Sequence, residues 1–339
     1  MSGEPGPPVH MLKIYHLFTL LLLAQSARSQ GDYAPVDSLV ASLDTRSRDV
    51  DEVAHRLTEP FDREADKVRA IFYWMATHIA YDCKRYRSPK RRKTIKGRNA
   101  THVQRKKNRL HRKALRRTLG KRKGICQDYA DLFTALCKAA HLRAETITGH
   151  AKRYPFPVSR TRFGSNHAWN LVYIDEQPHL LDVTWASGYT DKRVTHFRFA
   201  LNEAYYLTDP AKLIYDHYPR YESHQLLADP VSERAYIGLP AVGSYFLMSE
   251  LAGISGAYSP DRSQLCVEVL LGELAGQPRF MAKDTNGNSL PLRVEAIARG
   301  VRLYLPTTEL RRGKVSLYLQ PADALQLGLL AEFMHSRNN

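Results

Sequence analysis

A strongly basic segment interrupts this chain and limits what the chain can fold into. Between Lys84 and Lys123 there are 20 lysine and arginine residues and no aspartate or glutamate. So many charges with so few apolar side chains cannot form a buried core, and any fold must carry the segment on its surface. Alone it is expected to be disordered, although Leu110 to Leu119 could form a basic helix if acidic groups lay against it. The rest of the chain holds 30 basic against 34 acidic residues, so the formal net charge of +16 comes from this segment.

The chain is long enough for two domains, because it has 339 residues. Its N-terminus resembles an export signal: Lys13 precedes an apolar run from Ile14 to Ala24, which is too short to span a bilayer, and small residues follow. A secreted or periplasmic protein is therefore expected. The composition predicts a signal peptide, a first domain with the basic insertion, a second domain and a C-terminal tail, at residues 1–29, 33–239 with the insertion at 84–123, 240–322 and 323–339.

Hydrophobic periodicity predicts helices on both sides of the basic segment. The run from Arg63 to Ala80 has Asp62 as a candidate N-cap and repeats apolar residues at helical spacing. A second helix is predicted to begin near Cys126 and to end near His141, with one apolar stripe. These two helices would lie at the two ends of the insertion.

Beyond His141 the periodicity changes to that of strands. Short β-rich runs are predicted at Ala144–His150, His167–Ile174 and His179–Trp185, so helices followed by strands indicate an α+β domain with an antiparallel sheet. From about Pro240, alternating runs and a DTNGN turn predict a small all-β, sandwich-like domain.

Cys126 is the first residue that indicates chemistry. A thiol acts as a nucleophile when it is a thiolate, and the N-terminal end of a helix favours the thiolate through unpaired backbone donors and the helix dipole. Gly124 would allow the chain to approach the helix tightly. A lone cysteine at a helix start is more often a small buried residue, so Cys126 alone indicates little.

His167 and Asp182 supply what an activated thiol needs. A base followed by a carboxylate on a neighbouring strand fixes the imidazole tautomer and stabilises the imidazolium. A tight hairpin through Asp175 to Pro178 would place Asp182 opposite Leu171, about 13 Å along the strand from His167. A bulge, a strong twist or a different register must close that gap.

Together, the segments AIFYWMATHIAYD, GICQDYADLF, NHAWNLV and LLDVTWASG resemble the transglutaminase-like superfamily, and most of all its kyphoscoliosis peptidase-like branch, which has a papain-like fold. The resemblance covers Asp62–Asp82 and Lys123 to about Leu239, and includes YYLTDPAKLIYDHYP. It implies a papain/transglutaminase-like core in which the helix that carries the cysteine packs on the sheet. It also implies a catalytic triad of Cys126, His167 and Asp182.

The resemblance implies an acyl-transfer enzyme, either a cysteine protease (a hydrolase) or a transglutaminase-type acyltransferase. The triad would attack a peptide or glutamine amide and pass the acyl group to water or to an amine. The alternative is an inactive binding or scaffold module, since the superfamily also contains such members. Gln127, Trp169, Trp185 and Tyr81 are candidates for the substrate cleft, although buried aromatic residues on strands are more often core.

No cofactor and no metal are expected, because no cysteine or histidine residues stand at zinc-ligand spacing. With Cys126 reserved for chemistry, Cys83, Cys137 and Cys266 leave an odd cysteine, so no disulfide framework is implied. The partners expected are a protein or peptide substrate and, through Lys84 to Lys123, an acidic polymer or surface. A solvated loop is the simpler alternative for that segment. Nucleic acid is not expected, because Tyr86 is the segment's only residue for base stacking.

Overall fold

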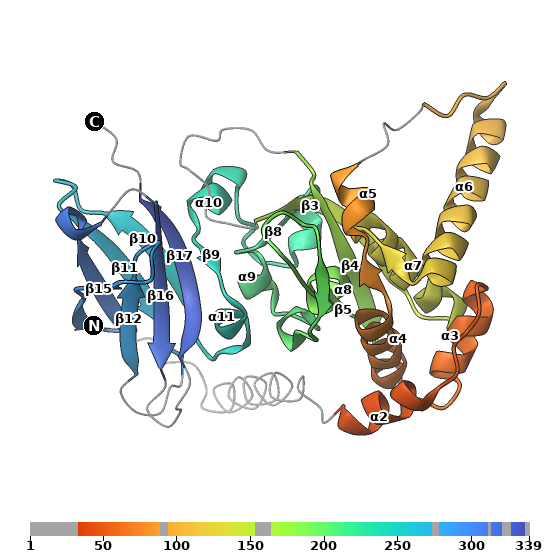
Figure 1. The fold of residues 1–339 in the computed structure, drawn as a ribbon, viewed down its shortest axis with the longest axis horizontal. Coiled ribbons are helices and arrows are strands. Elements are labelled where there is room, and N and C mark those ends of the chain that lie inside the picture. The colour runs from red at the N-terminus through yellow and green to blue at the C-terminus, as the bar shows by residue number, and fades with distance from the viewer. Residues whose placement is uncertain are drawn as a thin grey trace, which may run out of the picture.

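The computed structural model describes residues 33–88, 94–152, 164–272, 278–310, 313–320 and 327–335. The signal peptide expected at residues 1–29 lies outside them. The described chain forms a helix-rich part, a central antiparallel sheet and a C-terminal part built of two further sheets, which lies at the opposite end of the molecule from helix α6 (Figure 1). The expected α+β core followed by an all-antiparallel β region is confirmed.

One core helix starts at a clear local signal, whereas the expected N-cap Asp62 is wrong, because α4 begins at Glu64 and its N-cap position is Arg63, which makes no side-chain capping hydrogen bond. Asp49 caps one helix and accepts hydrogen bonds from two backbone N–H groups of its first turn. Helix α4 buries an apolar face that includes Ile71, Phe72 and Met75. The N-terminal helices are α2 Ala34–Ser42, α3 Val50–Thr58, α4 Glu64–His78, α5 Cys83–Arg87, α6 Ala100–Lys121 and α7 Cys126–Ala139.

The central sheet has the strand order β5-β4-β3-β8, and every neighbouring pair is antiparallel. Helix α7 packs on β3 and β4, and its buried face and the inner strand residues belong to one hydrophobic core. The strands are β3 Ala144–Ala151, β4 His167–Ile174, β5 Gln177–Leu181 and β8 His217–Pro219.

The register of the β4–β5 hairpin differs from the expected one by two residues. Asp175 and Glu176 both have positive φ and form a two-residue turn, which pairs Ile174 with Gln177. This register places Leu181 opposite Asn170. The expected strand through Trp185 is also wrong, because β5 ends at Leu181 and the chain then turns into helix α8, Val183–Ala186. The two differences remove the gap that the expected register left between His167 and Asp182.

Much of the basic segment is a helix and not a disordered loop. Helix α6 buries Leu115, Thr118 and Leu119 at its C-terminal end. Acidic groups do lie against it, since Arg117 pairs with Asp128 of α7. A basic helix was expected here only if acidic groups lay against it. Asp128, which lies outside the segment, is such a group.

The remaining elements are short, and most of them lie between the central sheet and the C-terminal strands along the chain. A short parallel pair joins the two ends of the insertion, and a hairpin of β6 and β7 follows α8. These elements are β1 Ala80–Tyr81, β2 Lys123–Gly124, β6 Gly188–Thr190, β7 Phe197–Phe199, η1 Glu203–Tyr205, α9 Pro210–Leu213, η2 Glu222–Gln225, α10 Glu233–Gly238 and α11 Ser244–Met248. Among the described residues, no helix has both the length and the apolar composition needed to cross a bilayer.

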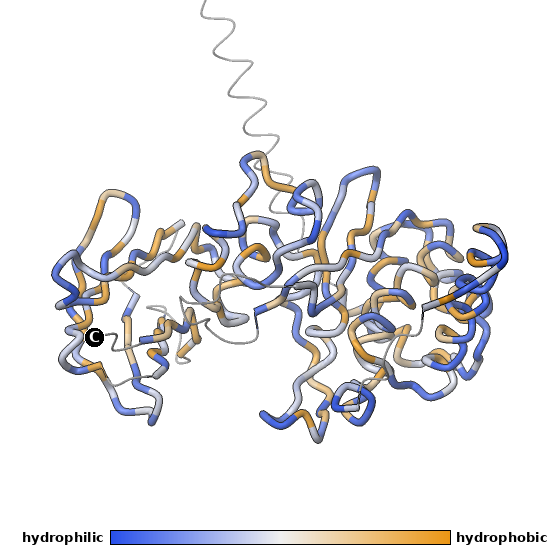
Figure 2. The backbone as a smooth tube through the Cα atoms, turned by 90° about the horizontal axis from the view of Figure 1, so that it is seen from above, coloured by the Kyte–Doolittle hydropathy of each residue, from blue (hydrophilic) through white to orange (hydrophobic). Residues whose placement is uncertain are grey.

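The C-terminal part consists of two antiparallel sheets, with strand orders β10-β11-β15-β14 and β13-β12-β16-β17-β9. Apolar and polar residues alternate along much of this part (Figure 2), and the buried residues of both sheets share one core. The strands are β9 Ala241–Val242, β10 Gly253–Tyr258, β11 Gln264–Leu270, β12 Arg279–Lys283, β13 Ser289–Leu290, β14 Arg293–Ile297, β15 Gly300–Pro306, β16 Gly313–Gln320 and β17 Gly328–His335; η3 spans Thr307–Glu309.

The tail expected at residues 323–339 is wrong for its central part. Strand β17 lies within it and pairs with β16 on one side and β9 on the other. Tyr258 and His335 are joined by a hydrogen bond of 2.8 Å between the two sheets. The apolar residues of the run LLAEFM therefore complete the second sheet, and the C-terminal part continues at least to His335.

Candidate active site

Cys126 is the first residue of α7, and it is half-buried. The parallel pair β1–β2 delivers the chain to this point, and Gly124 comes so close to Asp128 that an added Cβ would lie 2.8 Å from the Asp128 Cβ. The Asp128 carboxylate accepts a hydrogen bond of 2.9 Å from the backbone N–H of Ile125. The Cys126 thiol therefore lies at the positive end of α7, and the Asp128 side chain holds the first turn of that helix in place.

Two arginines at the two ends of the basic insertion also bind Asp128. Arg85 lies on α5, before the insertion's long helix, and Arg117 lies on α6 itself; both donate to the Asp128 carboxylate, Arg117 at 3.0 Å. Asp128 is almost completely buried, whereas each arginine is partly exposed. The insertion is thus attached to the first turn of the helix that carries Cys126.

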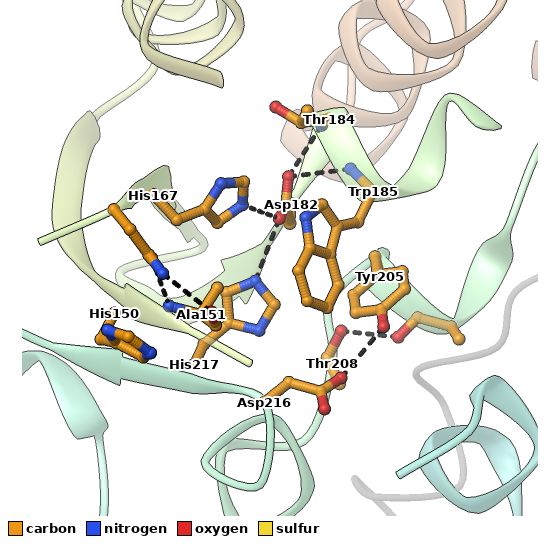
Figure 3. A network of polar contacts seen from close by, with 12 residues as sticks. His150, Ala151, His167, Asp182, Thr184, Trp185, Tyr205, Thr208, Asp216 and His217 are labelled. Atoms are coloured by element: carbon orange, nitrogen blue, oxygen red, sulfur yellow. Dashed lines mark hydrogen bonds and ion pairs between the residues drawn. The ribbon is translucent and has the colours of Figure 1, made fainter. Parts of the chain in front are cut away.

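His167 and Asp182 are joined directly. His167 opens β4, and its Nε2 lies 2.5 Å from Asp182 Oδ2 (Figure 3). Asp182 follows β5 and caps α8, because its Oδ1 accepts hydrogen bonds from the backbone N–H groups of Thr184 at 2.7 Å and Trp185 at 3.1 Å. The structure therefore brings together the histidine and the carboxylate that the sequence singled out.

The charge of Asp182 keeps a second proton on the His167 imidazole. Burial lowers the pKa of His167, but the neighbouring Asp182 carboxylate outweighs burial and raises that pKa to about 10; the nearby Cys126 side chain acts in the same direction. Burial likewise raises the pKa of Asp182, but His167 and His217 outweigh it and hold that pKa below its ordinary value. The arrangement is an imidazolium between a carboxylate and a thiol.

His217 is a second imidazole at the same carboxylate, and the sequence analysis missed it. Its Nε2 lies 3.0 Å from Asp182 Oδ2, and the residue is buried on β8 (Figure 3). Burial lowers the pKa of His217, so the ring is neutral. A signal was present, because His217 lies in the segment YYLTDPAKLIYDHYP that resembles the superfamily, but nothing in the segment distinguished this residue.

Among the described residues, one group could in principle hold a metal ion: His167, Asp182 and His217. Their candidate ligand atoms lie within 4.8 Å of one another. The separations of 2.5 and 3.0 Å between the nitrogens and Oδ2 are hydrogen-bond distances. Two ligands at about 2.1 Å from a tetrahedral zinc ion would lie about 3.4 Å apart. The geometry fits shared protons better than a shared metal ion.

A cleft of about 380 Å³ opens at Cys126 and His167. Of the cleft candidates, Tyr81 and Trp185 line it. Trp169 does not, because it is buried in the core and stacks on His167 with a ring separation of 6.0 Å. Gln127 is not among the lining residues either. Its side-chain amide donates to Asp131 at 2.9 Å.

The other walls of the cleft were not anticipated. The hairpin β6–β7 contributes the aromatic side chains of Tyr189 and Phe197, and Asp191 lies beside them. Val242 and Glu332 come from the C-terminal sheets. Both parts of the molecule therefore form the cleft.

Comparison with known proteins identifies the family of the residues that surround this site. Residues 51–186 match the family model of the transglutaminase-like superfamily. The kyphoscoliosis peptidase of Homo sapiens is 32% identical over 199 residues, which are 58% of this chain and 27% of that protein. Hillarin of Drosophila melanogaster is 29% identical over 136 residues, which are 35% of this chain and 16% of hillarin. The chain thus spans about a quarter or less of the length of these relatives.

Among solved structures, the crystal structure of a TGase is 17% identical and covers 50% of this chain and 38% of that chain, with a TM-score of 0.26. At that TM-score the overlap carries no argument, so the family rests on the sequence matches. The helix that begins at Cys126, the strand that begins at His167, and Asp182 at the cap of α8 all lie within the matched range. This chain contains a domain of the transglutaminase-like superfamily, homologous to the kyphoscoliosis peptidases, at residues 51–186.

Proposed function

We propose that this domain is a cysteine acyl-transfer enzyme with Cys126 as nucleophile, His167 as acid and base, and Asp182 as the group that orients His167. The observation that carries the proposal is the 2.5 Å contact between His167 and Asp182 in a cleft that the half-buried thiol of Cys126 also lines. Such an arrangement is what an acyl-transfer thiol requires.

In the proposed reaction the Cys126 sulfur attacks a peptide or glutamine carbonyl while its proton is held on His167. A carbon–sulfur bond forms, and the carbonyl electron pair moves to oxygen, to which the backbone N–H of Cys126 at the start of α7 would donate a hydrogen bond. The carbon–nitrogen bond then breaks as His167 gives its proton to the leaving nitrogen. Water or an amine attacks the thioester, loses its proton to His167 and releases the Cys126 sulfur.

Selective alkylation of Cys126 tests the nucleophile. Cys83 and Cys137 are buried, and burial raises the pKa of both thiols, so they should react slowly with iodoacetamide at neutral pH. Cys126 should react at least about tenfold faster than Cys83, Cys137 or Cys266. Equal rates would overturn the proposal and favour a non-catalytic binding module.

Mass spectrometry of a glutamine-containing peptide tests the reaction class. Incubation of the peptide with the full chain should yield a hydrolysed or deamidated product, and added primary amine should appear as a new amide if the acyl group is transferred. Cys126→Ala should abolish both products. Product formation by Cys126→Ala would exclude Cys126 as the nucleophile.

We also propose that the protein is exported, on the basis of the N-terminal apolar run alone. Expression of the full sequence in a secretory host should release a chain that begins after about residue 29. Retention of the uncleaved chain inside the cell would contradict this assignment.

A further inference from the structure

The Asp182 carboxylate is fixed from two sides. The backbone of α8 holds Oδ1, and two imidazoles share Oδ2. Four donors are about as many as an ionised carboxylate accepts. With each oxygen engaged, the carboxylate cannot rotate away from His167 without breaking a hydrogen bond.

His217 is itself held rigidly. Its ring packs against Trp185 at 4.7 Å, Trp169 at 5.0 Å and Tyr205 at 5.9 Å between ring centres. Its Nδ1 is buried and has no hydrogen-bond partner among the described residues. A proton on Nδ1 would be an unpaired buried donor, so the proton belongs on Nε2, from which it points at Asp182.

We propose that His217 is a positioning residue of the site: it donates Nε2–H to Asp182 Oδ2 and fixes the direction in which that oxygen faces His167. Because the ring is neutral, it adds this donor without adding a positive charge that would compete with the imidazolium. Its effect on the thiol rests on the proposed function, whereas its effect on the His167–Asp182 hydrogen bond does not.

The titratable groups that surround His217 are few. His167 and Asp182 share its hydrogen-bond network, and Tyr205 packs on its ring and donates to Asp216 at 3.0 Å. Burial raises the pKa of Asp216 to about 7, so this neighbour titrates near neutrality. Any pH profile must therefore be compared between variants and not interpreted alone.

The test compares His217→Phe, which keeps an aromatic ring but removes the donor, with His217→Gln, whose amide can still donate. In the full chain, the iodoacetamide rate of Cys126 should fall about 10- to 100-fold in His217→Phe, with a changed pH profile between about pH 5 and pH 9, and should stay within about threefold in His217→Gln. Parent-like rates in a folded His217→Phe would overturn the proposal.

Proton NMR separates this proposal from the proposed function. The short His167–Asp182 hydrogen bond should give a far-downfield proton signal in the parent, which should shift or vanish in His217→Phe and remain in His217→Gln. This readout needs no reactive thiol. If His217→Phe does not fold, loss of the signal in a folded His217→Gln would count against the proposal and its retention would support it.

A second, independent observation concerns α6. This helix carries nine lysine and arginine residues and no acid. Among the described residues, Arg117 is the one of the nine that has an ion pair with an acidic side chain. The remaining charges face solvent or backbone groups, and a bound anionic partner would relieve the repulsion between them.

Four of the arginines form one stripe. They follow the spacing i, i+4, i+7 and i+11 and extend over about 16 Å of helix. All four are exposed, and the buried residues of the helix, Leu115, Thr118 and Leu119, are confined to its C-terminal end. The stripe consists of Arg105, Arg109, Arg112 and Arg116.

The helix lacks the features that other anionic partners require. It has no phenylalanine, tyrosine or tryptophan on which bases could stack. Leu110 is its one exposed large apolar side chain, so it has no apolar face to enter a membrane. What remains is a row of guanidinium groups, which bind sulfate or carboxylate oxygens bidentately.

We propose that α6 binds an extended sulfated polysaccharide along the stripe Arg105, Arg109, Arg112 and Arg116. A linear polyanion with regularly spaced sulfates needs only cations at regular spacing. The expected export of the chain favours such a polymer over nucleic acid. The helix leaves the body beside α7, so a bound polymer would lie close to the domain that carries Cys126.

Calorimetric titration of the full chain with a short heparin oligosaccharide tests this. Replacing the four stripe arginines with glutamine should weaken binding at least about 100-fold and reduce the slope of log affinity against log salt by about 3 to 4. Glutamine is a good helix former, so α6 should persist. The control replaces four exposed basic residues elsewhere with glutamine, Lys138, Arg234, Arg279 and Arg299, and should change affinity less than about threefold.

An equal loss of affinity in the stripe variant and in the control would show that binding depends on the net charge of the chain and not on the stripe. That result would overturn the proposal. Tighter binding of a DNA duplex of equal charge would assign the surface to nucleic acid instead. Tighter binding of anionic lipid vesicles would assign it to a membrane.

Discussion

Asp182 joins more of the candidate site than any other residue. Its oxygens accept hydrogen bonds from the backbone of Thr184 and Trp185 and from the rings of His167 and His217. Because these donors offset the cost of burial, the carboxylate stays ionised in the interior. The carboxylate in turn stabilises a proton on His167, so the two residues titrate as a pair.

The pair should make stability depend on pH in a definite direction. The pKa of His167 in the fold is about 10, above its ordinary value of 6.5. A group whose pKa rises on folding stabilises the fold below its unfolded pKa, and that stabilisation is lost as pH rises through the folded pKa. The free energy of unfolding of the parent should therefore exceed that of His167→Gln most at about pH 5 to 6, and the difference should shrink towards pH 10.

Urea unfolding at a series of pH values measures this difference. The same series for His55→Gln, an exposed histidine of α3, shows the effect of removing an imidazole from the surface. A difference between the parent and His167→Gln that grows with rising pH would contradict the assignment of the proton to His167.

Asp182→Asn should lower the reactivity of Cys126 while it preserves the packing around position 182. The amide would keep the shape of the side chain but remove the charge that holds His167 protonated, and its NH₂ group could face the imidazole. The alkylation rate of Cys126 should fall by about 10²- to 10⁴-fold. Asp66→Asn, at an exposed ion pair with Arg63, should leave that rate unchanged. A parent-like rate in Asp182→Asn would exclude Asp182 from the triad.

Among the elements, strand β3 determines where the two histidines lie. Gly149 pairs with His167 of β4 on one side and with Pro219 of β8 on the other. A Cβ at this position would lie 2.2 Å from the backbone oxygen of Tyr218 and 2.6 Å from the Trp169 ring. The glycine therefore permits the close approach of β8, and β8 carries His217.

Gly149→Ala should accordingly push β8 away from β3. Backbone and a rigid indole ring cannot yield easily, so we expect a loss of about 1 to 3 kcal/mol in the free energy of unfolding. Gly238→Ala is the matched control, because nothing lies within 4 Å of its added Cβ, and it should change stability by less than about 0.5 kcal/mol. Equal effects in urea unfolding would refute the packing argument.

Periodicity and capping residues in the sequence predicted a helix or strand correctly where no contact with a distant part of the chain overrides the local preference. Helix α7 begins at Cys126, as its periodicity indicated, and β4 spans His167–Ile174 as expected. The β-rich run after Leu181 was misassigned because Asp182 caps a helix, and capping overrides the strand preference of Val and Thr. The partners of α6 and the role of His217 depend on residues far away in the chain, which periodicity cannot reveal.

At the scale of the molecule, Lys152 attaches the connection between the central sheet and the C-terminal sheets. Its Nζ is buried and donates to the backbone oxygens of Tyr236 at 2.5 Å and Leu239 at 2.9 Å. Burial lowers the pKa of Lys152 to about 7. The sequence predicted the C-terminal strands themselves, but this attachment joins residues more than 80 positions apart.

Lys152→Met should loosen this connection. The methionine fills a similar volume but leaves two buried carbonyl groups without their donor, so we expect a loss of about 2 kcal/mol in the free energy of unfolding. Lys192→Met, at an exposed residue that also lines the cleft, should change it by less than about 0.5 kcal/mol. An unchanged denaturation midpoint in Lys152→Met would show that the two hydrogen bonds contribute nothing net.

The parallel pair β1–β2 brings the two ends of the insertion together: Ala80 lies beside Lys123, and Tyr81 beside Gly124. The chain therefore leaves the body and returns to it at neighbouring backbone positions. A foreign peptide or a whole reporter domain could replace the basic helix between these positions, and Cys126 would keep its place only if the replacement also filled the core positions of Leu115 and Leu119 and gave Asp128 a substitute for Arg117.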